Sequence, residues 1–175
     1  TQEGETLEQY KQRMIDPISE SYCAAKWYNA TIWLGHGQTA SCHHPPGHWI
    51  PLEELKDNYT AIHNTKHKKL MRKYMQEGKR PAECEYCWKV EDMGKNHVSD
   101  RTFKTEIFKD EDVHKSAEMP WDENVMLRTL EISFDRACNF SCSYCNPAFS
   151  TAWVKDINTY GGYQNIQSDG RGHFV

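Results

Sequence analysis

The segment LEISFDRACNFSCSYC, residues 130–145, decides how the C-terminal part of the chain folds. Its opening residues, 130–134, alternate apolar and polar side chains, which is the period of a β-strand. Cys138, Cys142 and Cys145 follow on a loop with C-x3-C-x2-C spacing. The segment therefore predicts a strand that leads into a loop of converging thiols.

A helix is expected directly after this loop. Asn146 can cap it, and Pro147 suits its first position. Its apolar face carries one residue at every fourth position, namely Phe149, Trp153 and Ile157. Gly161 and Gly162 then end the helix. Strand, loop and helix together make one βα unit.

Three thiolates on one short loop suit a cubane iron–sulfur cluster, because each thiolate can bind a different iron. No fourth cysteine lies nearby in the sequence, so one iron keeps an open position that can chelate a substrate or cofactor. Clusters that only transfer electrons usually have four cysteine ligands and no such opening. The alternative is a zinc ion held by the three cysteines and a histidine such as His173.

The three-cysteine loop resembles the signature of radical S-adenosylmethionine (SAM) enzymes in three respects. These are the spacing of its cysteines, the aromatic Tyr144 before the last cysteine, and the position of the loop directly after a strand. The resemblance implies that Cys138, Cys142 and Cys145 hold a 4Fe–4S cluster whose open iron binds SAM. It implies that the reduced cluster cleaves SAM to methionine and a 5′-deoxyadenosyl radical, which abstracts hydrogen from a substrate. Tyr144 would lie against the adenine, and flavodoxin or ferredoxin would donate the electron.

The same resemblance implies that this βα unit begins a (β/α) barrel. The residues expected to face a helix layer are Leu130, Ile132 and Phe134. Those expected to face the barrel interior are Thr129, Glu131 and Ser133. A complete barrel of this type needs about 200 residues or more. We therefore expect the chain to be the N-terminal portion of a longer enzyme, truncated within the barrel and inactive alone. The alternative is that the remaining barrel lies on another polypeptide.

Upstream, the sequence predicts a helix and a hairpin. Apolar residues at helical spacing mark the helix: Leu7, Tyr10 and Met14. It ends at Pro17, which cannot continue a helix. Extended runs at 30–34 and 38–42 flank a turn that contains Gly35 and Gly37, which indicates a β-hairpin.

A second upstream helix is expected at residues 64–77, ended by Gly78 and then Pro81. Its predicted apolar face consists of Leu70, Met71, Tyr74 and Met75. Its predicted solvated face consists of Lys66, Lys68, Lys69 and Lys73. Residues 88–124 are weakly patterned and are expected to form a short helix or two and a linker.

Four further cysteines, Cys23, Cys42, Cys84 and Cys87, form a plausible set of metal ligands. Sulfurs on one zinc ion lie about 3.8 Å apart, whereas sulfurs on a cubane spread to roughly 6 Å or more. We expect the four cysteines to converge at the wider spacing. His43 and His44 follow Cys42 and are expected at the surface or beside the ligands.

Three features of this region resemble the Twitch/SPASM domains of radical SAM enzymes. Cys23 stands shortly before Trp27, a glycine-turn hairpin ends in Cys42, and a Gly-x-x-Pro-x-x-Cys-x-x-Cys run follows the helix. The resemblance implies an auxiliary 4Fe–4S cluster and favours a peptide substrate; zinc remains the alternative metal. The expected organisation is α+β: a Cys-rich hairpin-and-helix domain and linker at 1–124, and the start of the barrel at 125–175.

Composition narrows the class of protein. The 175 residues carry a net charge of −4 and a mean hydropathy of −0.86, which disfavours a general nucleic-acid binder and a membrane protein. Seven cysteines, an odd number without a secretory signal, fit a disulfide framework poorly and favour a reducing, cytoplasmic location. The second interpretation is a non-enzymatic protein with two zinc sites that binds a protein or nucleic acid.

Overall fold

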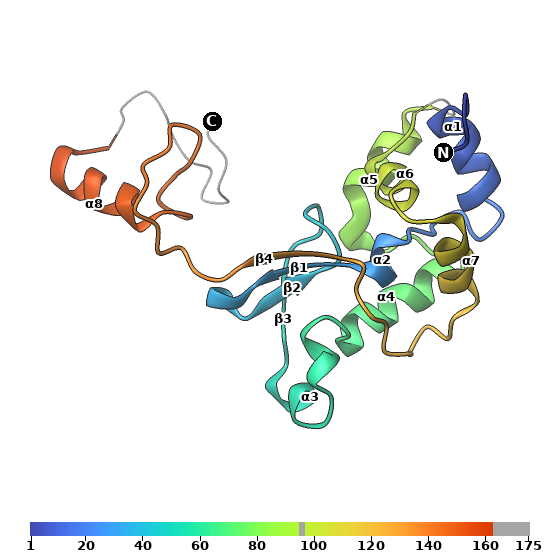
Figure 1. Cartoon of the computed structure of the whole chain (residues 1–175), viewed down its shortest axis with the longest axis horizontal. Coiled ribbons are helices and arrows are strands. Elements are labelled where there is room, and N and C mark those ends of the chain that lie inside the picture. Colours follow the sequence, from blue (N-terminus) through green and yellow to red (C-terminus); the bar gives the residue numbers. More distant parts are fainter. Residues whose placement is uncertain (95–96, 163–175) are drawn as a thin grey trace. The chain divides into compact units, whose positions relative to one another are not determined.

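The computed structural model describes residues 1–94 and 97–162 (Figure 1). The chain divides into two compact units, the N-terminal unit Thr1–Ile132 and the C-terminal unit Ser133–Val175. Helices and a small sheet are both present, which confirms the α+β class predicted from the sequence. None of the helices in the described part of the chain is long and apolar enough to cross a membrane.

The N-terminal unit contains a four-stranded sheet with the order β3-β2-β1-β4 (Figure 1). β1 (Asn29–Trp33) and β2 (Gln38–Ala40) form the predicted antiparallel hairpin. A 3-10 turn, Leu34–His36, joins them, and Gly37 follows at φ 63°, a left-handed conformation that glycine adopts without strain. β3 (His48–Trp49) extends the hairpin by pairing antiparallel with β2.

β4 (Thr129–Ser133) lies at the opposite edge of the sheet, beside β1. The Thr129 hydroxyl donates to Asn29 Oδ1 at 2.6 Å, and the Thr31 hydroxyl donates to Glu131 Oε2 at 3.2 Å. Residue numbers therefore increase in the same direction along both strands, so β4 runs parallel to β1. A strand separated from β1 by about a hundred residues of sequence thus completes the sheet.

The prediction of a strand here is confirmed, but its expected surroundings are wrong. Leu130 and Phe134 are 54% and 71% exposed, so they do not pack beneath a helix layer. Glu131 lies in solvent and not in a barrel interior. β4 is the outer strand of a sheet built on the hairpin, and the described residues add no strand beyond it. They therefore form no barrel unit.

The chain begins with α1 (Leu7–Tyr10), which continues as a π-helical turn, Lys11–Ile15. A capping box starts it: the Thr6 hydroxyl accepts from the Gln9 backbone N–H at 3.2 Å, and Gln9 Oε1 accepts from the Thr6 N–H at 2.8 Å. The helical segment ends before Pro17, as predicted.

The core of the N-terminal unit forms where α1, α2 (Ala25–Tyr28) and the later helices meet. Trp27 is fully buried and packs near Tyr22, with ring centroids 5.2 Å apart. Other large members of this core are Tyr10, Met14, Ile15, Tyr28, Met75, Trp88, Phe108 and Val113. Each such side chain contributes about 1.5–3 kcal/mol through removal of apolar surface from water.

α4 (Lys66–Gln76) is confirmed as a helix, but the prediction of its faces is wrong in part. Leu70, expected inside, is 38% exposed, whereas Lys68, expected in solvent, is 1% exposed. Arg72 is equally buried because its guanidinium donates hydrogen bonds to two backbone carbonyls and to a side-chain oxygen. Carbonyls of distant segments offset the cost of burying Arg72, and hydropathy alone does not report them. The Lys68 Nζ has no hydrogen-bond partner.

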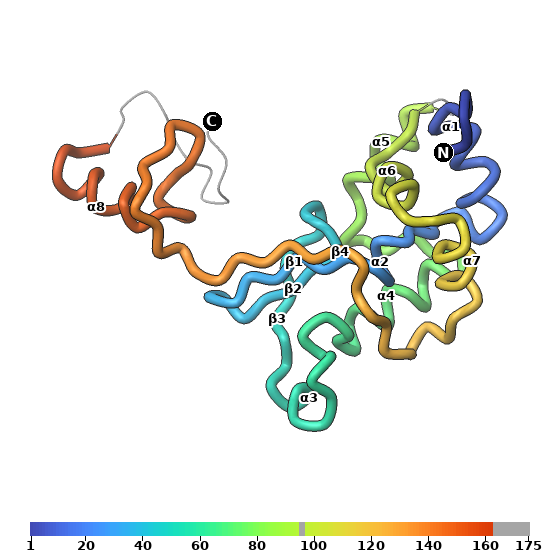
Figure 2. Tube along the Cα trace, viewed as in Figure 1, coloured from blue at the N-terminus to red at the C-terminus, as the bar shows by residue number. Residues whose placement is uncertain are grey.

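Short helical elements make up most of the remaining N-terminal unit (Figure 2). They are α3 (Leu52–Asp57), two 3-10 turns at Tyr59–Ile62 and Ala82–Cys84, α5 (Glu85–Asp92), α6 (Asp100–Glu106) and α7 (Asp110–Glu118). Most of the region expected to hold a short helix or two and a linker is therefore helical, because α5, α6 and α7 all bury one face.

In the C-terminal unit, α8 (Thr151–Tyr160) follows the cysteine loop. It begins later than predicted, because Ser150 provides the cap by accepting from the Trp153 N–H at 3.4 Å. Asn146 instead accepts from the Ala148 N–H at 2.8 Å and forms a turn that ends before the helix. Gly161, at φ 86°, ends α8 as expected.

Candidate metal centres

Cys23, Cys42, Cys84 and Cys87 line one cavity in the N-terminal unit, which confirms that they converge. We call this cavity the four-cysteine site. Cys23 precedes α2, Cys42 follows β2, Cys84 ends a 3-10 turn and Cys87 lies in the first turn of α5. Three separate segments, joined by tertiary packing, therefore contribute the four thiols.

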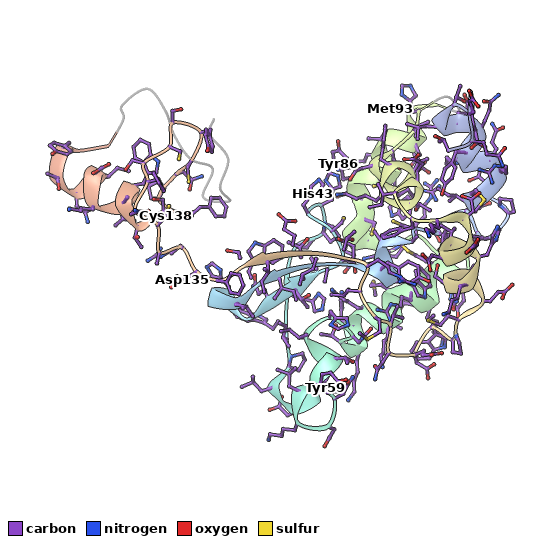
Figure 3. All side chains as sticks on the ribbon, in the orientation of Figure 1. His43, Tyr59, Tyr86, Met93, Asp135 and Cys138 are labelled. Carbon is purple, nitrogen blue, oxygen red and sulfur yellow. The ribbon has the colours of Figure 1, made fainter. Side chains whose placement is uncertain are left out.

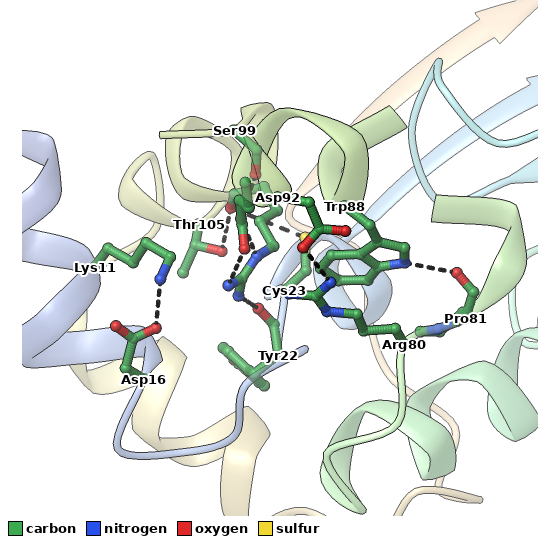
Figure 4. Close-up of polar contacts among 12 residues, drawn as sticks. Lys11, Asp16, Tyr22, Cys23, Arg80, Pro81, Trp88, Asp92, Ser99 and Thr105 are labelled. Carbon is green, nitrogen blue, oxygen red and sulfur yellow. Dashed lines mark hydrogen bonds and ion pairs between the residues drawn. The ribbon is translucent and has the colours of Figure 1, made fainter. Parts of the chain in front are cut away.

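Local hydrogen bonds hold two of these thiols in place. The Cys84 N–H donates to the Pro81 carbonyl at 3.0 Å, and Trp88 Nε1 donates to the same carbonyl at 2.8 Å (Figure 4). Both contacts bind the start of α5 to the turn before it. Because Cys87 is one helical turn beyond Cys84, the two thiols share one side of this segment.

Arg101 connects the segments around the site. Its guanidinium makes a bidentate pair with Glu91, at 2.6 and 2.8 Å, and donates to the Tyr22 carbonyl at 2.7 Å. Both partners of the ion pair have side chains that are less than a tenth exposed. Arg101 thereby ties α6 to α5 and to the residue before Cys23, which fixes the relative position of three segments that carry or flank ligands.

The four cysteines can bind a zinc ion or a cluster. All seven cysteines are free thiols. Among the described residues, no three cysteine sulfurs all lie within 4.8 Å of one another. The wider spacing expected for a cubane stays a prediction, and so does the metal that the site binds.

Burial controls the protonation of these thiols. It raises the pKa of Cys23 to about 12 and that of Cys42 to about 11, and it raises the pKa values of Cys84 and Cys87 as well. Without a cation the four thiols stay protonated at neutral pH. A metal or cluster must therefore supply positive charge and displace their protons on binding.

One buried lysine stands beside this site. Lys26, 2% exposed, forms an ion pair with Glu83, which also accepts a hydrogen bond from His67 Nε2 at 2.6 Å. Burial opposes the charge of Lys26, but Cys84 and Glu83 outweigh it and raise the pKa of the ammonium group. The site thus has a permanent positive charge next to its thiols, which favours an anionic thiolate cluster.

The second set of thiols lies in the C-terminal unit, on the three-cysteine loop at residues 138–145 (Figure 3). The Cys138 N–H donates to the Thr151 hydroxyl at 3.0 Å, and its carbonyl accepts from that hydroxyl and from the Ala152 N–H, each at 3.1 Å. Trp153 Nε1 donates to the Cys142 carbonyl at 3.0 Å. The loop backbone is therefore anchored on the first turn of α8.

The thiols of this loop are partly exposed, and the Cys145 thiol donates to the Asn146 carbonyl at 3.7 Å. Cys138, Cys142 and Cys145 are half-buried, and most residues between them are exposed. Tyr144 is 85% exposed, and the Cys142 side chain hydrogen-bonded to its hydroxyl raises the pKa of this tyrosine. Its expected contact with an adenine stays a prediction. His173, the alternative fourth ligand, lies outside the described residues.

Sequence reasoning missed the polar residues that complete the four-cysteine site. Lys26, Ser41, Asp100 and Arg101 line its cavity. His44 lines it too, in keeping with the expectation that it lies beside the ligands. The sequence gives no sign that Lys26, Ser41, Asp100 and Arg101 belong to the site. None of them stands at a distance from a cysteine that is typical of a known metal-binding motif. Only the packing of α2, α6 and the loop after β2 brings them to the site.

No family model, curated protein or solved structure matches the chain. The functional argument therefore depends on the cysteines and on the groups around them.

Proposed function

We propose that this chain forms the cluster-binding part of a radical SAM enzyme. In this proposal Cys138, Cys142 and Cys145 ligate a 4Fe–4S cluster that binds SAM at its open iron. The four-cysteine site holds an auxiliary 4Fe–4S cluster. The observation that carries the proposal is a loop with three half-buried thiols, anchored on a helix, in a unit whose sequence contains no fourth cysteine.

The anchoring of the loop supports this role. Hydrogen bonds to its backbone at Cys138, Phe140 and Cys142 come from the start of α8, so the thiols are not needed to hold the loop. The N-terminus of a helix favours nearby negative charge, which a thiolate-bound cluster carries. When bound, the cluster and SAM would supply a substrate radical; the chain's own residues hold and orient them.

The four-cysteine site supports the auxiliary cluster. Its thiols come from three segments, are mostly buried and line one cavity. Lys26 and Arg101 add positive charge around them. The alternative remains a non-enzymatic protein with two zinc sites that binds a protein or nucleic acid. That interpretation relied on a basic helix surface, and the burial of Lys68 weakens it.

Anaerobic reconstitution with iron and sulfide tests the proposal. We expect a brown protein with about eight irons per chain, four for each cubane. Cys142→Ala should remove about half of the iron, and Cys84→Ala should remove the other half. Addition of SAM to the reduced protein should change the electron paramagnetic resonance signal, and Cys142→Ala should abolish that change.

The controls separate the two sites. Because Cys142 and Cys84 lie in different units, each variant should keep the cluster of the other unit. A colourless protein that binds zinc at both sites and takes up no iron would contradict the proposal. A SAM-dependent signal that survives Cys142→Ala would contradict the assignment of the three-cysteine loop.

A further inference from the structure

We propose that His43, His44 and Asp100 form a separate zinc-binding site at the rim of the four-cysteine site. A nitrogen of each imidazole and a carboxylate oxygen of Asp100 all lie within 4.8 Å of one another. His43 and His44 belong to the loop after β2, and Asp100 is the first residue of α6. This proposal does not depend on which metal the cysteines bind.

The separations between these ligand atoms match what zinc needs. Zinc binds imidazole nitrogen and carboxylate oxygen at about 2.0–2.2 Å, so tetrahedral ligand atoms lie roughly 3.4 Å apart. His44 Nε2 lies 3.0 Å from Asp100 Oδ2, and His43 Nε2 lies 3.9 Å from the same oxygen. The two measured separations fall on either side of the zinc value. Small side-chain movements would therefore complete the site.

The surrounding structure holds the ligands in this arrangement. The His44 ring stacks on Tyr86, with centroids 3.9 Å apart and 14° between the planes. Ser99 and Arg101, the residues on either side of Asp100, both donate to Glu91 at 2.6 Å. Asp100 is thus fixed by its neighbours, and its own carboxylate remains directed at the two imidazoles.

A simple ion pair explains only part of this arrangement. The His44–Asp100 contact at 3.0 Å is an ordinary hydrogen bond. It leaves unexplained why His43 brings a second ring within 4.1 Å of the first, beside the same carboxylate. Two protonated imidazoles would repel each other there. Two neutral imidazoles and one carboxylate are a common zinc ligand set, and a divalent cation would attract all three.

Three protein ligands leave a fourth position on the zinc for water or a substrate group, as in catalytic zinc sites. His44 and Asp100 also line the four-cysteine cavity. A zinc ion there would place positive charge beside the thiols, so it would favour their thiolate forms. Zinc at the rim and metal at the cysteines should therefore strengthen each other's binding.

Cobalt(II) titration of the full chain tests the site, after both cysteine sets have been loaded with clusters or, failing that, with one equivalent of zinc each. Cobalt bound by nitrogen and oxygen lacks the intense thiolate-to-cobalt charge-transfer bands. We expect one cobalt per chain to bind without these bands and to be displaced by zinc. His43→Ala and Asp100→Asn should weaken zinc binding by about tenfold or more. His36→Ala, an exposed histidine of the same hairpin, should not change it.

Several results would overturn the proposal. Zinc affinity unchanged in His43→Ala would exclude a shared site. The His43 side chain is half-exposed, so this substitution removes little buried surface. Charge-transfer bands on all bound cobalt would place the ion on cysteines instead. Loss of cluster iron in His44→Ala, with no change in zinc binding, would make His44 a cluster ligand. Circular dichroism melts of each variant confirm that the fold is retained.

Discussion

Lys26 and Glu83 form a buried ion pair beside the four-cysteine site. Burial by itself raises the pKa of Glu83, but the hydrogen bond from His67 and the charge of Lys26 outweigh it and hold this pKa at about 2. A carboxyl group with a lowered pKa in the folded state stabilises the fold above its unfolded pKa. That stabilisation is lost as the pH falls from about 4.5 towards 2.

Glu83→Gln should therefore remove an acid-dependent part of the stability. We expect the variant to be less stable than the unmodified protein at pH 7, because Lys26 is left buried without its anionic partner. The difference should shrink as the pH falls below about 4.5. Urea unfolding at several pH values measures both effects. Glu53→Gln, at an exposed carboxylate, is the control; an equal loss in it would contradict the assignment.

Arg72 makes a second testable case of buried charge. Its guanidinium donates to the Lys26 and Glu123 carbonyls at 3.0 Å and to Asn64 Oδ1 at 2.8 Å. Arg72→Met keeps the apolar stem but leaves three acceptors without this donor. We expect the free energy of unfolding to fall by about 3 kcal/mol or more. Chemical denaturation measures it.

The matched control for this variant is Lys66→Met on the same helix, because Lys66 is exposed. That substitution should change the free energy of unfolding by less than about 0.5 kcal/mol. Equal effects of the two substitutions would mean that the hydrogen bonds of Arg72 contribute nothing measurable.

The burial of single residues was only partly predictable. Met71 and Met75 were expected inside from their helical spacing, and they are buried. Lys68 and Arg72 share that face at positions that a hydropathy pattern assigns to solvent. Arg72 is buried among hydrogen-bond acceptors from other segments, whereas the buried Lys68 Nζ has no hydrogen-bond partner. Local sequence does not contain that information.

At the scale of elements, α8 and the three-cysteine loop form one hydrogen-bonded assembly. Ser150 is fully buried: its hydroxyl accepts from the Trp153 N–H and donates to the Phe140 carbonyl at 2.7 Å. One side chain therefore both caps the helix and holds the middle of the loop. The sequence predicted the helix but placed its start too early, because Pro147 after Asn146 also fits a helix start.

Ser150→Ala should loosen the loop without touching a thiol. Loss of the cap costs about 1 kcal/mol, and the Phe140 carbonyl loses its donor. We expect faster loss of iron from the three-cysteine loop when a chelator is added to reconstituted protein, with the four-cysteine site unaffected. Thr159→Ala, an exposed position in the last turn of α8, serves as the control. Identical rates of iron loss in both variants would contradict the role of Ser150.

For β4, the prediction of a strand is confirmed, but the prediction of what packs around it is wrong. The alternation at residues 130–134 reports local conformation, and the strand at Thr129–Ser133 confirms it. Alternation does not report which strand lies alongside. β4 pairs with β1 at the edge of the hairpin sheet, so Leu130 stays exposed.

At the scale of the whole molecule, the N-terminal unit is built from short helices around a small sheet. The four cysteines connect the segment before α2, the end of the hairpin and the start of α5. A metal centre there would bind only the folded arrangement, so its binding free energy would add to the free energy of unfolding.

Metal removal should therefore lower the thermal stability of the N-terminal unit. We expect reconstituted protein to unfold at a higher temperature than the chelated protein, by an amount equivalent to about 3 kcal/mol or more. Cys84→Ser should abolish this difference. Cys142→Ser should preserve it, because Cys142 lies in the C-terminal unit. Differential scanning calorimetry measures the transitions; equal melting temperatures with and without metal would contradict the coupling.

The sequence by itself determined the two cysteine sets, the hairpin and the positions of the main helices. These features follow from residue spacing and from glycine and proline, which act over a few residues. Only the tertiary structure decided that β4 joins the hairpin sheet, that Lys68 and Arg72 are buried, and that His43 and His44 meet Asp100. Each of these depends on contacts between segments far apart in the chain, and such contacts leave no periodic pattern in either segment.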